Sequence, residues 1–133
     1  MIIISLTEKK QMKENNFIDS NILIYAHTLQ DENKMKIAQG ILSSEQIIIA
    51  NTQGINESIN VFIKRFKIFL NNIQNIIEQT FLFVTIKTIN SETIQLGLEI
   101  CKNYYFSYYD SLIIASALQN ECSILYSEDL QHH

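Results

Sequence analysis

The chain has 133 residues, 47% of them hydrophobic and 18% charged, with a formal net charge of −4 at pH 7. These values predict one globular domain with a substantial core, and they exclude a disordered or fibrous chain. The negative charge also excludes a global basic field of the kind that attracts nucleic acid.

Membrane and disulfide signals are both lacking in the sequence. The opening run Met1-Ile2-Ile3-Ile4 is too short for a signal peptide core or a membrane span, and no other apolar run reaches membrane length. Cys101 and Cys122 have neither CxxC nor metal-site spacing, so we expect buried, reduced thiols. We therefore expect a cytoplasmic protein that does not associate with membranes.

The chain order of apolar runs predicts strands that alternate with helices. Residues 1–14 are expected to be an N-terminal extension, either a mis-called start or disordered, and 15–133 a single domain. Short apolar runs predict strands at 17–19, 46–50, 81–86 and 122–126. Helical spacing predicts helices from about 22, at 31–42, 53–66, 68–79 and 91–104, and at 108–119 after a capping Ser107.

This alternation predicts the fold class. Strands separated by one or two helices are typical of an α/β protein, and short strands without polar alternation favour a buried sheet. We expect a mostly parallel sheet of four to five strands, flanked by helices on both faces in three layers.

Aspartates follow the first and last predicted strands. Asp19 ends the first strand and Asp129 lies just beyond the last, after Ser127 and Glu128. Ligands of parallel α/β sheets bind beyond the carboxyl ends of the strands. We therefore expect both carboxylates at one rim of the sheet.

Asp110 has two interpretations. Ser107-Tyr108-Tyr109-Asp110 has the form of a capping box, in which a carboxylate stabilises the helix N-terminus. The helix that follows is apolar almost all round, which indicates a central helix whose N-terminus opens into a cleft. Glu57 also has two interpretations. It lies off the apolar stripe of its helix, as a solvated glutamate would, yet it lies near the rim.

Crowded carboxylates repel one another, and a hard divalent cation relieves the repulsion. Acids that hold one or two Mg²⁺ or Mn²⁺ ions are a recurring arrangement for phosphodiester hydrolysis, in which the metal activates water and neutralises developing charge. We therefore consider Mg²⁺ (or Mn²⁺) the expected cofactor.

Four segments in this order resemble the PIN-domain family, in particular the VapC-like ribonuclease toxins of bacterial toxin–antitoxin pairs. They are NFIDSNILIYA, INESINVFIKR, SYYDSLIIASAL and ILYSEDLQH, within about residues 15–132. The resemblance implies a metal-dependent endoribonuclease that acts on RNA as a homodimer and is silenced by a cognate antitoxin across the active-site groove. It implies that four acids are catalytic and hold the metal, supported by hydroxyl and amide groups around them: Asp19, Glu57, Asp110 and Asp129, with Ser20, Asn21 and Ser127.

Two features depart from this pattern. Such toxins usually continue through a further segment with a last strand, whereas this chain stops at His133, which puts stability, dimerisation or activity in doubt. The net charge is negative, and the only basic cluster is Lys64, Arg65 and Lys67. This cluster is either an RNA contact or an exposed, solvated face.

Two other functions are compatible with rim aspartates. A phosphoacceptor receiver domain would need an acid pair after the first strand and a late lysine, and neither is placed so here. A non-catalytic PIN-fold module that binds RNA or protein is the stronger alternative. The four acids argue against this module, and the short C-terminus argues for it.

Overall fold

A computed structural model of the chain describes residues 2–6, 13–128 and 130. Its centre is a five-stranded sheet with the order β1-β5-β2-β3-β4. Neighbouring strands from β5 to β4 are parallel, and only β1 is antiparallel to its neighbour β5. The strands are β1 (Ile2–Ser5), β2 (Asn15–Ile18), β3 (Ile47–Asn51), β4 (Val84–Lys87) and β5 (Ile124–Ser127). The predicted α/β class and mostly parallel sheet are confirmed.

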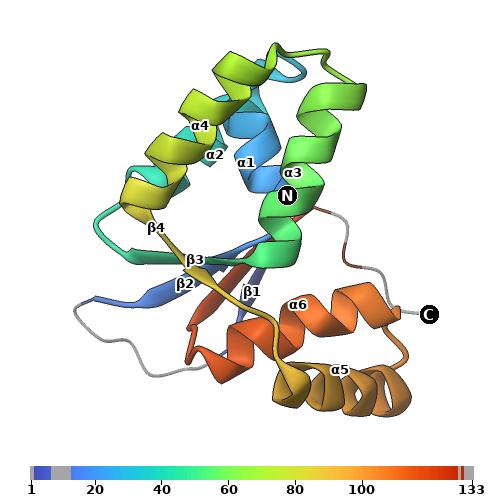
Figure 1. Cartoon of the computed structure of the whole chain (residues 1–133). Coiled ribbons are helices and arrows are strands. Elements are labelled where there is room, and N and C mark those ends of the chain that lie inside the picture. Colours follow the sequence, from blue (N-terminus) through green and yellow to red (C-terminus); the bar gives the residue numbers. More distant parts are fainter. Residues whose placement is uncertain (1, 7–12, 129, 131–133) are drawn as a thin grey trace.

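Helices cover both faces of the sheet (Figure 1). The first four helices lie on one face, and α6 lies on the other face between the sheet and α5. The bounds are α1 (Ser20–Ala26), α2 (Glu32–Leu42), α3 (Thr52–Lys64), α4 (Leu70–Phe83), α5 (Ser91–Tyr104) and α6 (Tyr108–Gln119). The fold therefore has three layers, as the sequence predicts.

Successive strand residues divide the core between the two faces. Ile48 and Ala50 of β3 pack with the cluster beneath α1 to α4, whereas Ile49 packs with Phe17 and Leu125 against α6. This is the period-two alternation of a strand that is buried on both sides. Asn51 and Ser127, the last residues of β3 and β5, are buried polar residues at the carboxyl ends of these strands.

Side-chain caps begin most of the helices, and several lie at the rim of the sheet. Asp19 caps α1, Asn51 caps α3 and Ser107 caps α6, each accepting a hydrogen bond from a backbone N–H of the first turn. A side-chain acceptor at this position satisfies an otherwise unpaired donor. The Ser107 cap and the bounds of α6 agree with the sequence prediction.

Strand β1 was not predicted. Ile2–Ser5 pairs antiparallel with β5, from Ile2 opposite Ser127 to Ser5 opposite Ile124. Ile2–Ser5 is thus ordered rather than disordered, while residues 1 and 7–12 lie outside the described part of the chain. That residues 1–14 are an extension or a mis-called start stays a prediction. A four-residue run carries no periodic signal, and only the edge of β5 gives it a partner.

The fourth strand also begins later than predicted. The run Phe81 to Ile86 has strand propensity, but α4 continues to Phe83 and β4 starts at Val84. The Val84 N–H donates to the Thr80 carbonyl, and parallel pairing of Val84 with Ile48 fixes the start of the strand. Tertiary pairing has overridden a local preference.

Close packing of α5 on α6 holds the helix that carries Asp110. A Cβ placed on Gly97 of α5 would lie 3.0 Å from Cδ2 of Leu112, a buried residue of α6. We expect Gly97→Ala to lower the free energy of unfolding by about 1 kcal/mol, because overpacking outweighs the gain in helix propensity. Urea denaturation followed by circular dichroism measures this change.

Gly40→Ala is the matched control, because a Cβ at Gly40 in α2 would have no atom within 4 Å. This variant should raise the free energy of unfolding by about 0.5–1 kcal/mol, since alanine costs less backbone entropy in a helix. Equal stabilisation by both substitutions would show that α5 and α6 are not tightly packed.

Candidate active site

The rim of the sheet begins with a contact between the neighbouring strands β2 and β5. Asp19 directly follows β2, and its N–H donates to the Tyr126 carbonyl of β5 at 3.0 Å. The Ser127 Oγ donates to Asp19 Oδ2 at 2.8 Å, and both residues are buried. Two segments more than one hundred positions apart are thus joined at the predicted rim.

Asp19 is a buried carboxylate that accepts hydrogen bonds from two donors. Its Oδ1 accepts from the Ser20 N–H at 2.7 Å, and its Oδ2 accepts from Ser127. Burial raises the pKa of the Asp19 carboxyl, these two hydrogen bonds lower it, and the nearby charges of Glu57 and Asp110 raise it again. The net result is a pKa above the ordinary value, which indicates a site that favours added positive charge.

Glu57 lies on the second turn of α3 and faces the same site. Its Oε2 accepts from the Ser20 Oγ at 3.2 Å, and its Oε1 accepts from the Gln53 Nε2 at 3.0 Å. Ser20 therefore donates to both acids, with its backbone to Asp19 and its hydroxyl to Glu57. The residue is exposed, as the solvated interpretation requires, yet it is held next to Asp19.

Asp110 lies in the first turn of α6, where its N–H donates to the Ser107 Oγ at 3.2 Å. This bond is the serine half of the predicted capping box. The carboxylate is half-buried and adds to the negative potential at Asp19. The cap and the rim are thus compatible roles, because the helix start holds the residue while its side chain reaches the shared site.

The three acids line one cavity of about 530 Å³. Its wall is formed by α1, α3 and α6 with the segment between α1 and α2. The lining includes the predicted Ser20 and Asn21 and further residues that sequence reasoning missed: Ile24, Tyr25, Gln30, Asn60, Val61, Tyr109 and Ile113.

Helical spacing from the acids could have found several of the missed residues. Asn60 and Val61 are three and four positions after Glu57, and Ile113 is three positions after Asp110. Residues at these spacings lie on the same face of a helix. Gln30 lies in the connection between α1 and α2 and has no such signal.

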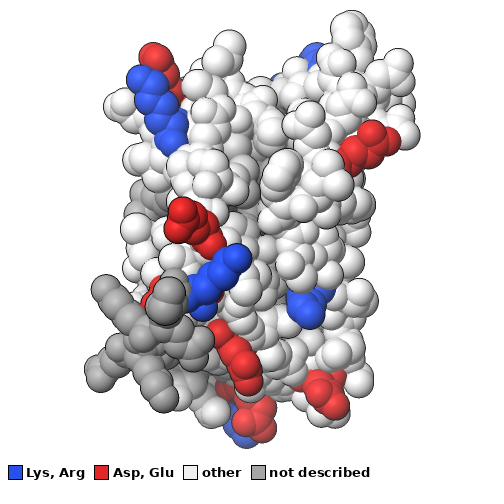
Figure 2. All heavy atoms as spheres, turned by 90° about the vertical axis from the view of Figure 1, so that its left-hand side faces the viewer, with Lys and Arg blue, Asp and Glu red and all other residues white. Residues whose placement is uncertain are grey.

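The basic cluster divides in the structure. Arg65, at the end of α3, lines the cavity, whereas Lys64 and Lys67 do not. On the face shown in Figure 2, positive and negative side chains are interspersed, and neither sign forms a patch. In the described lining of the cavity, Arg65 is the cationic side chain.

Glu128 has a different partner from the other acids. Its carboxylate forms an ion pair with the Lys34 ammonium of α2, which also donates to the Tyr25 hydroxyl at 3.4 Å. The Lys34 ammonium holds the pKa of Glu128 below its usual value. This pairing is consistent with Asp129 rather than Glu128 as the fourth acid, but Asp129 lies outside the described residues, so its role stays a prediction.

The donor chemistry of the cavity fits a hard divalent cation. Carboxylate oxygens are the ligands that Mg²⁺ and Mn²⁺ prefer. The pKa of Asp19 is raised mainly by burial, and the charges of Glu57 and Asp110 raise it further. Within the described ranges, however, no three Asp, Glu, His or Cys side chains are arranged so that they could hold an ion together. Asp19, Glu57 and Asp110 share the cavity without forming a closed ligand set.

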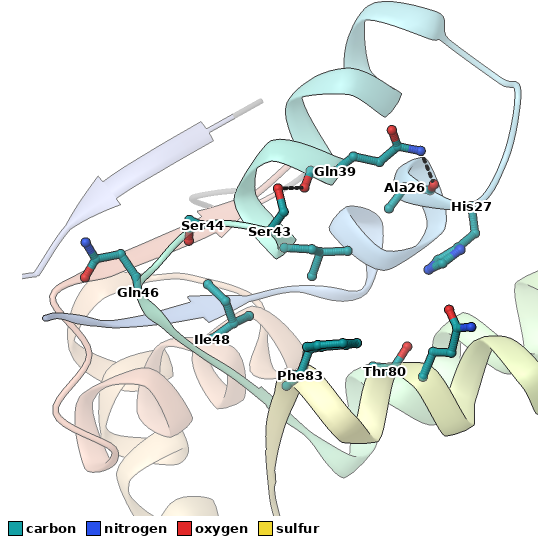
Figure 3. A pocket seen from close by; sticks show the side chains of 12 residues that line it. Ala26, His27, Gln39, Ser43, Ser44, Gln46, Ile48, Thr80 and Phe83 are labelled. Carbon is teal, nitrogen blue, oxygen red and sulfur yellow. Dashed lines mark hydrogen bonds between the residues drawn. The ribbon is translucent and has the colours of Figure 1, made fainter.

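A second cavity, of about 520 Å³, lies between α1, α2, α4 and the strands β3 and β4 (Figure 3). Its lining includes Leu42, Ile48, Phe83 and Val84 but no acid. The Gln39 side chain donates to the Ala26 carbonyl at 3.0 Å at its edge. This cavity offers apolar surface rather than hydrolytic groups.

None of the helices in the described ranges combines the length and apolarity needed to cross a bilayer.

Comparison with known proteins places this rim in context. A search of curated proteins found no match. The fold is similar to the VapC20 toxin of Mycobacterium tuberculosis, described as cleaving the sarcin–ricin loop, with a TM-score of 0.69, 11% identity, and 86% of this chain and 89% of that chain covered. It is also similar to a toxin–antitoxin complex from Klebsiella pneumoniae, with a TM-score of 0.65, 16% identity and 86% of each chain covered. The PIN domain family model matches residues 17–133, and the chain therefore belongs to the PIN domain family.

Proposed function

We propose that this protein is a metal-dependent endoribonuclease that acts as a toxin and is neutralised by a cognate antitoxin. The observation that carries the proposal is the meeting of Asp19, Glu57 and Asp110 in one cavity at the rim of the sheet. Membership of the PIN family and the fold shared with VapC20 support the same activity.

Each acid has a proposed role in holding Mg²⁺ or Mn²⁺, as one or two ions. Asp19 is the central ligand, because Ser20 and Ser127 fix both of its oxygens. Glu57 and Asp110 flank it from α3 and α6, and Asp129 completes the set. The bound metal would activate water and neutralise charge on the phosphoryl group.

The hydroxyl and amide groups have positioning roles in this proposal. Ser20 links Asp19 to Glu57, so the two carboxylates are held together before substrate arrives. Asn21 lines the cavity one residue further along α1. Arg65 is the proposed contact to an RNA phosphate, with Lys64 and Lys67 as weaker candidates outside the cavity.

The proposed partners are a cognate antitoxin and a second copy of the chain. The toxin–antitoxin complex with the same fold supports the first. Exposed apolar side chains next to the edge strand β4 support association with protein, since Phe81, Leu82 and Phe83 are 56%, 77% and 74% exposed.

A non-catalytic RNA- or protein-binding module remains the second candidate function. The open arrangement of the described acids, which does not by itself form an ion site, favours it. Metal-dependent cleavage distinguishes the two functions, since the module would bind RNA but leave it intact.

We expect the purified protein to cleave unpaired RNA in Mg²⁺ or Mn²⁺, and chelation to abolish cleavage. The variants Asp19→Asn, Glu57→Gln and Asp110→Asn should each reduce the cleavage rate at least about 100-fold. Each replaces a charged metal ligand with a neutral side chain of similar shape. Gel analysis of end-labelled RNA measures the rate.

Glu99→Gln is the control, because Glu99 is an exposed acid of α5 outside the cavity. This variant should cleave normally. Absence of cleavage by the wild-type protein on a broad RNA panel would favour the non-catalytic module.

Metal should stabilise the folded protein, because the unfolded chain has no assembled site. Saturation at one hundred times the dissociation constant corresponds to about 2.7 kcal/mol, seen as a rise in Tm. The pKa of Asp19 is raised in the folded state. At a pH between the pKa of the unfolded chain and this raised pKa, the folded state therefore binds more protons than the unfolded state. A proton on Asp19 then competes with the metal ion.

The Tm rise on adding Mg²⁺ should therefore be larger at about pH 7.5 than at about pH 4.5. Differential scanning fluorimetry with matched ionic strength measures both. Asp19→Asn should lose the Mg²⁺ response at both pH values. An unchanged response in this variant would place the ion elsewhere.

A further inference from the structure

An aromatic segment borders the acidic cavity and has no assigned role. From the last residue of α5 into the first turn of α6 the chain reads Tyr104-Tyr105-Phe106-Ser107-Tyr108-Tyr109, and Asp110 follows at once. Tyr104, Tyr105 and Tyr109 are 59%, 65% and 64% exposed. Only Tyr109 of this segment lines the cavity.

The position of Tyr109 is fixed by its neighbours. It lies in the first turn of α6, which the Ser107 cap begins, and it is the residue before the acid. Its ring packs on Tyr108 at a tilt of 58°, with 5.7 Å between the centroids. An exposed ring supported in this way loses little side-chain freedom when a ligand stacks on it.

Electrostatic attraction alone would contribute little to RNA binding at this cavity. The chain has a net charge of −4, and three acids line the wall that a phosphodiester must approach. Among the residues that the structure describes, Arg65 is the one cationic side chain in that wall, so few phosphates can be neutralised there. Affinity must therefore come largely from another source, and stacking of bases on aromatic rings is the main one that does not depend on charge.

Arg65 lines the same cavity as the acids, from the end of α3. It is eight residues after Glu57 on the same helical face, which corresponds to about 12 Å along the axis. A phosphate further along the strand suits this distance. Tyr109, adjacent to Asp110, suits the base next to the bond that is cut.

We propose that Tyr109 is a stacking platform for one unpaired nucleobase beside the scissile phosphate, with Arg65 holding a neighbouring phosphate of the same strand. The proposal rests on the proposed function for the position of the cut bond. It names the substrate class as RNA with an unstacked base, because bases within a duplex present no open face to a side chain.

The test uses short unpaired RNAs that carry 2-aminopurine at each position in turn, in buffer with chelator so that no cleavage occurs. Binding to the full-length protein is followed by anisotropy, and stacking by quenching of 2-aminopurine. Tyr109→Leu should weaken binding at least about tenfold and remove the quenching at one position. Tyr109→Phe, which keeps the ring, should stay within about twofold of wild type.

Tyr104→Leu is the matched control, since Tyr104 is similarly exposed but does not line the cavity. It should bind and quench as wild type does. An abasic RNA at the quenched position should bind wild type and Tyr109→Leu equally, which completes a double-mutant cycle. Urea denaturation confirms that each variant is folded.

The outcomes separate this inference from the nuclease. Normal metal-dependent cleavage with unchanged binding by Tyr109→Leu overturns the platform and leaves the nuclease intact. Loss of quenching in Tyr109→Leu without any wild-type cleavage supports the platform and overturns the nuclease. Equal effects of Tyr109→Phe and Tyr109→Leu, or of Tyr104→Leu and Tyr109→Leu, overturn the platform.

Discussion

The buried carboxylate of Asp19 is the point on which the rest of the site depends. It follows the central strand β2, caps α1, and accepts hydrogen bonds from Ser20 and from Ser127 of the neighbouring strand. Parallel pairing that sets Ile18 opposite Tyr126 brings these groups together. Burying a charge is costly unless hydrogen bonds or an opposite charge compensate, so this position constrains what else can surround it.

The surrounding elements supply more negative charge rather than a balancing cation. Burial is the main cause of the raised pKa of Asp19, and Glu57 and Asp110 raise it further. Glu128 has its own partner in Lys34. A protein that only needed stability would gain by losing one of these acids. Their meeting in one cavity is the physical argument for an external cation, and it connects the fold to the proposed chemistry.

The same charge shapes how a nucleic acid can approach. A rim lined by acids repels phosphates, so binding has to combine the metal, one arginine and contacts that carry no charge. The exposed ring of Tyr109 beside Asp110 meets the last of these needs. Two adjacent residues in the first turn of α6 would then have linked roles. Tyr109 would recognise an unpaired base, and Asp110 would help to place the bond that is hydrolysed, so the choice of substrate and its cleavage would depend on the same helix start.

Local signals in the sequence determined the elements and most of the candidate acids. Apolar periodicity and caps such as Ser107 gave the helices, because these depend on neighbours within a few residues. Tertiary structure alone decided the strand pairing of Ile2–Ser5 and the start of β4, since a short strand exists only when another edge satisfies its backbone. It also decided which of the basic residues reaches the cavity and that Tyr109 shares the cavity with Asp19 and Glu57, because such proximity comes from helices packed on the sheet.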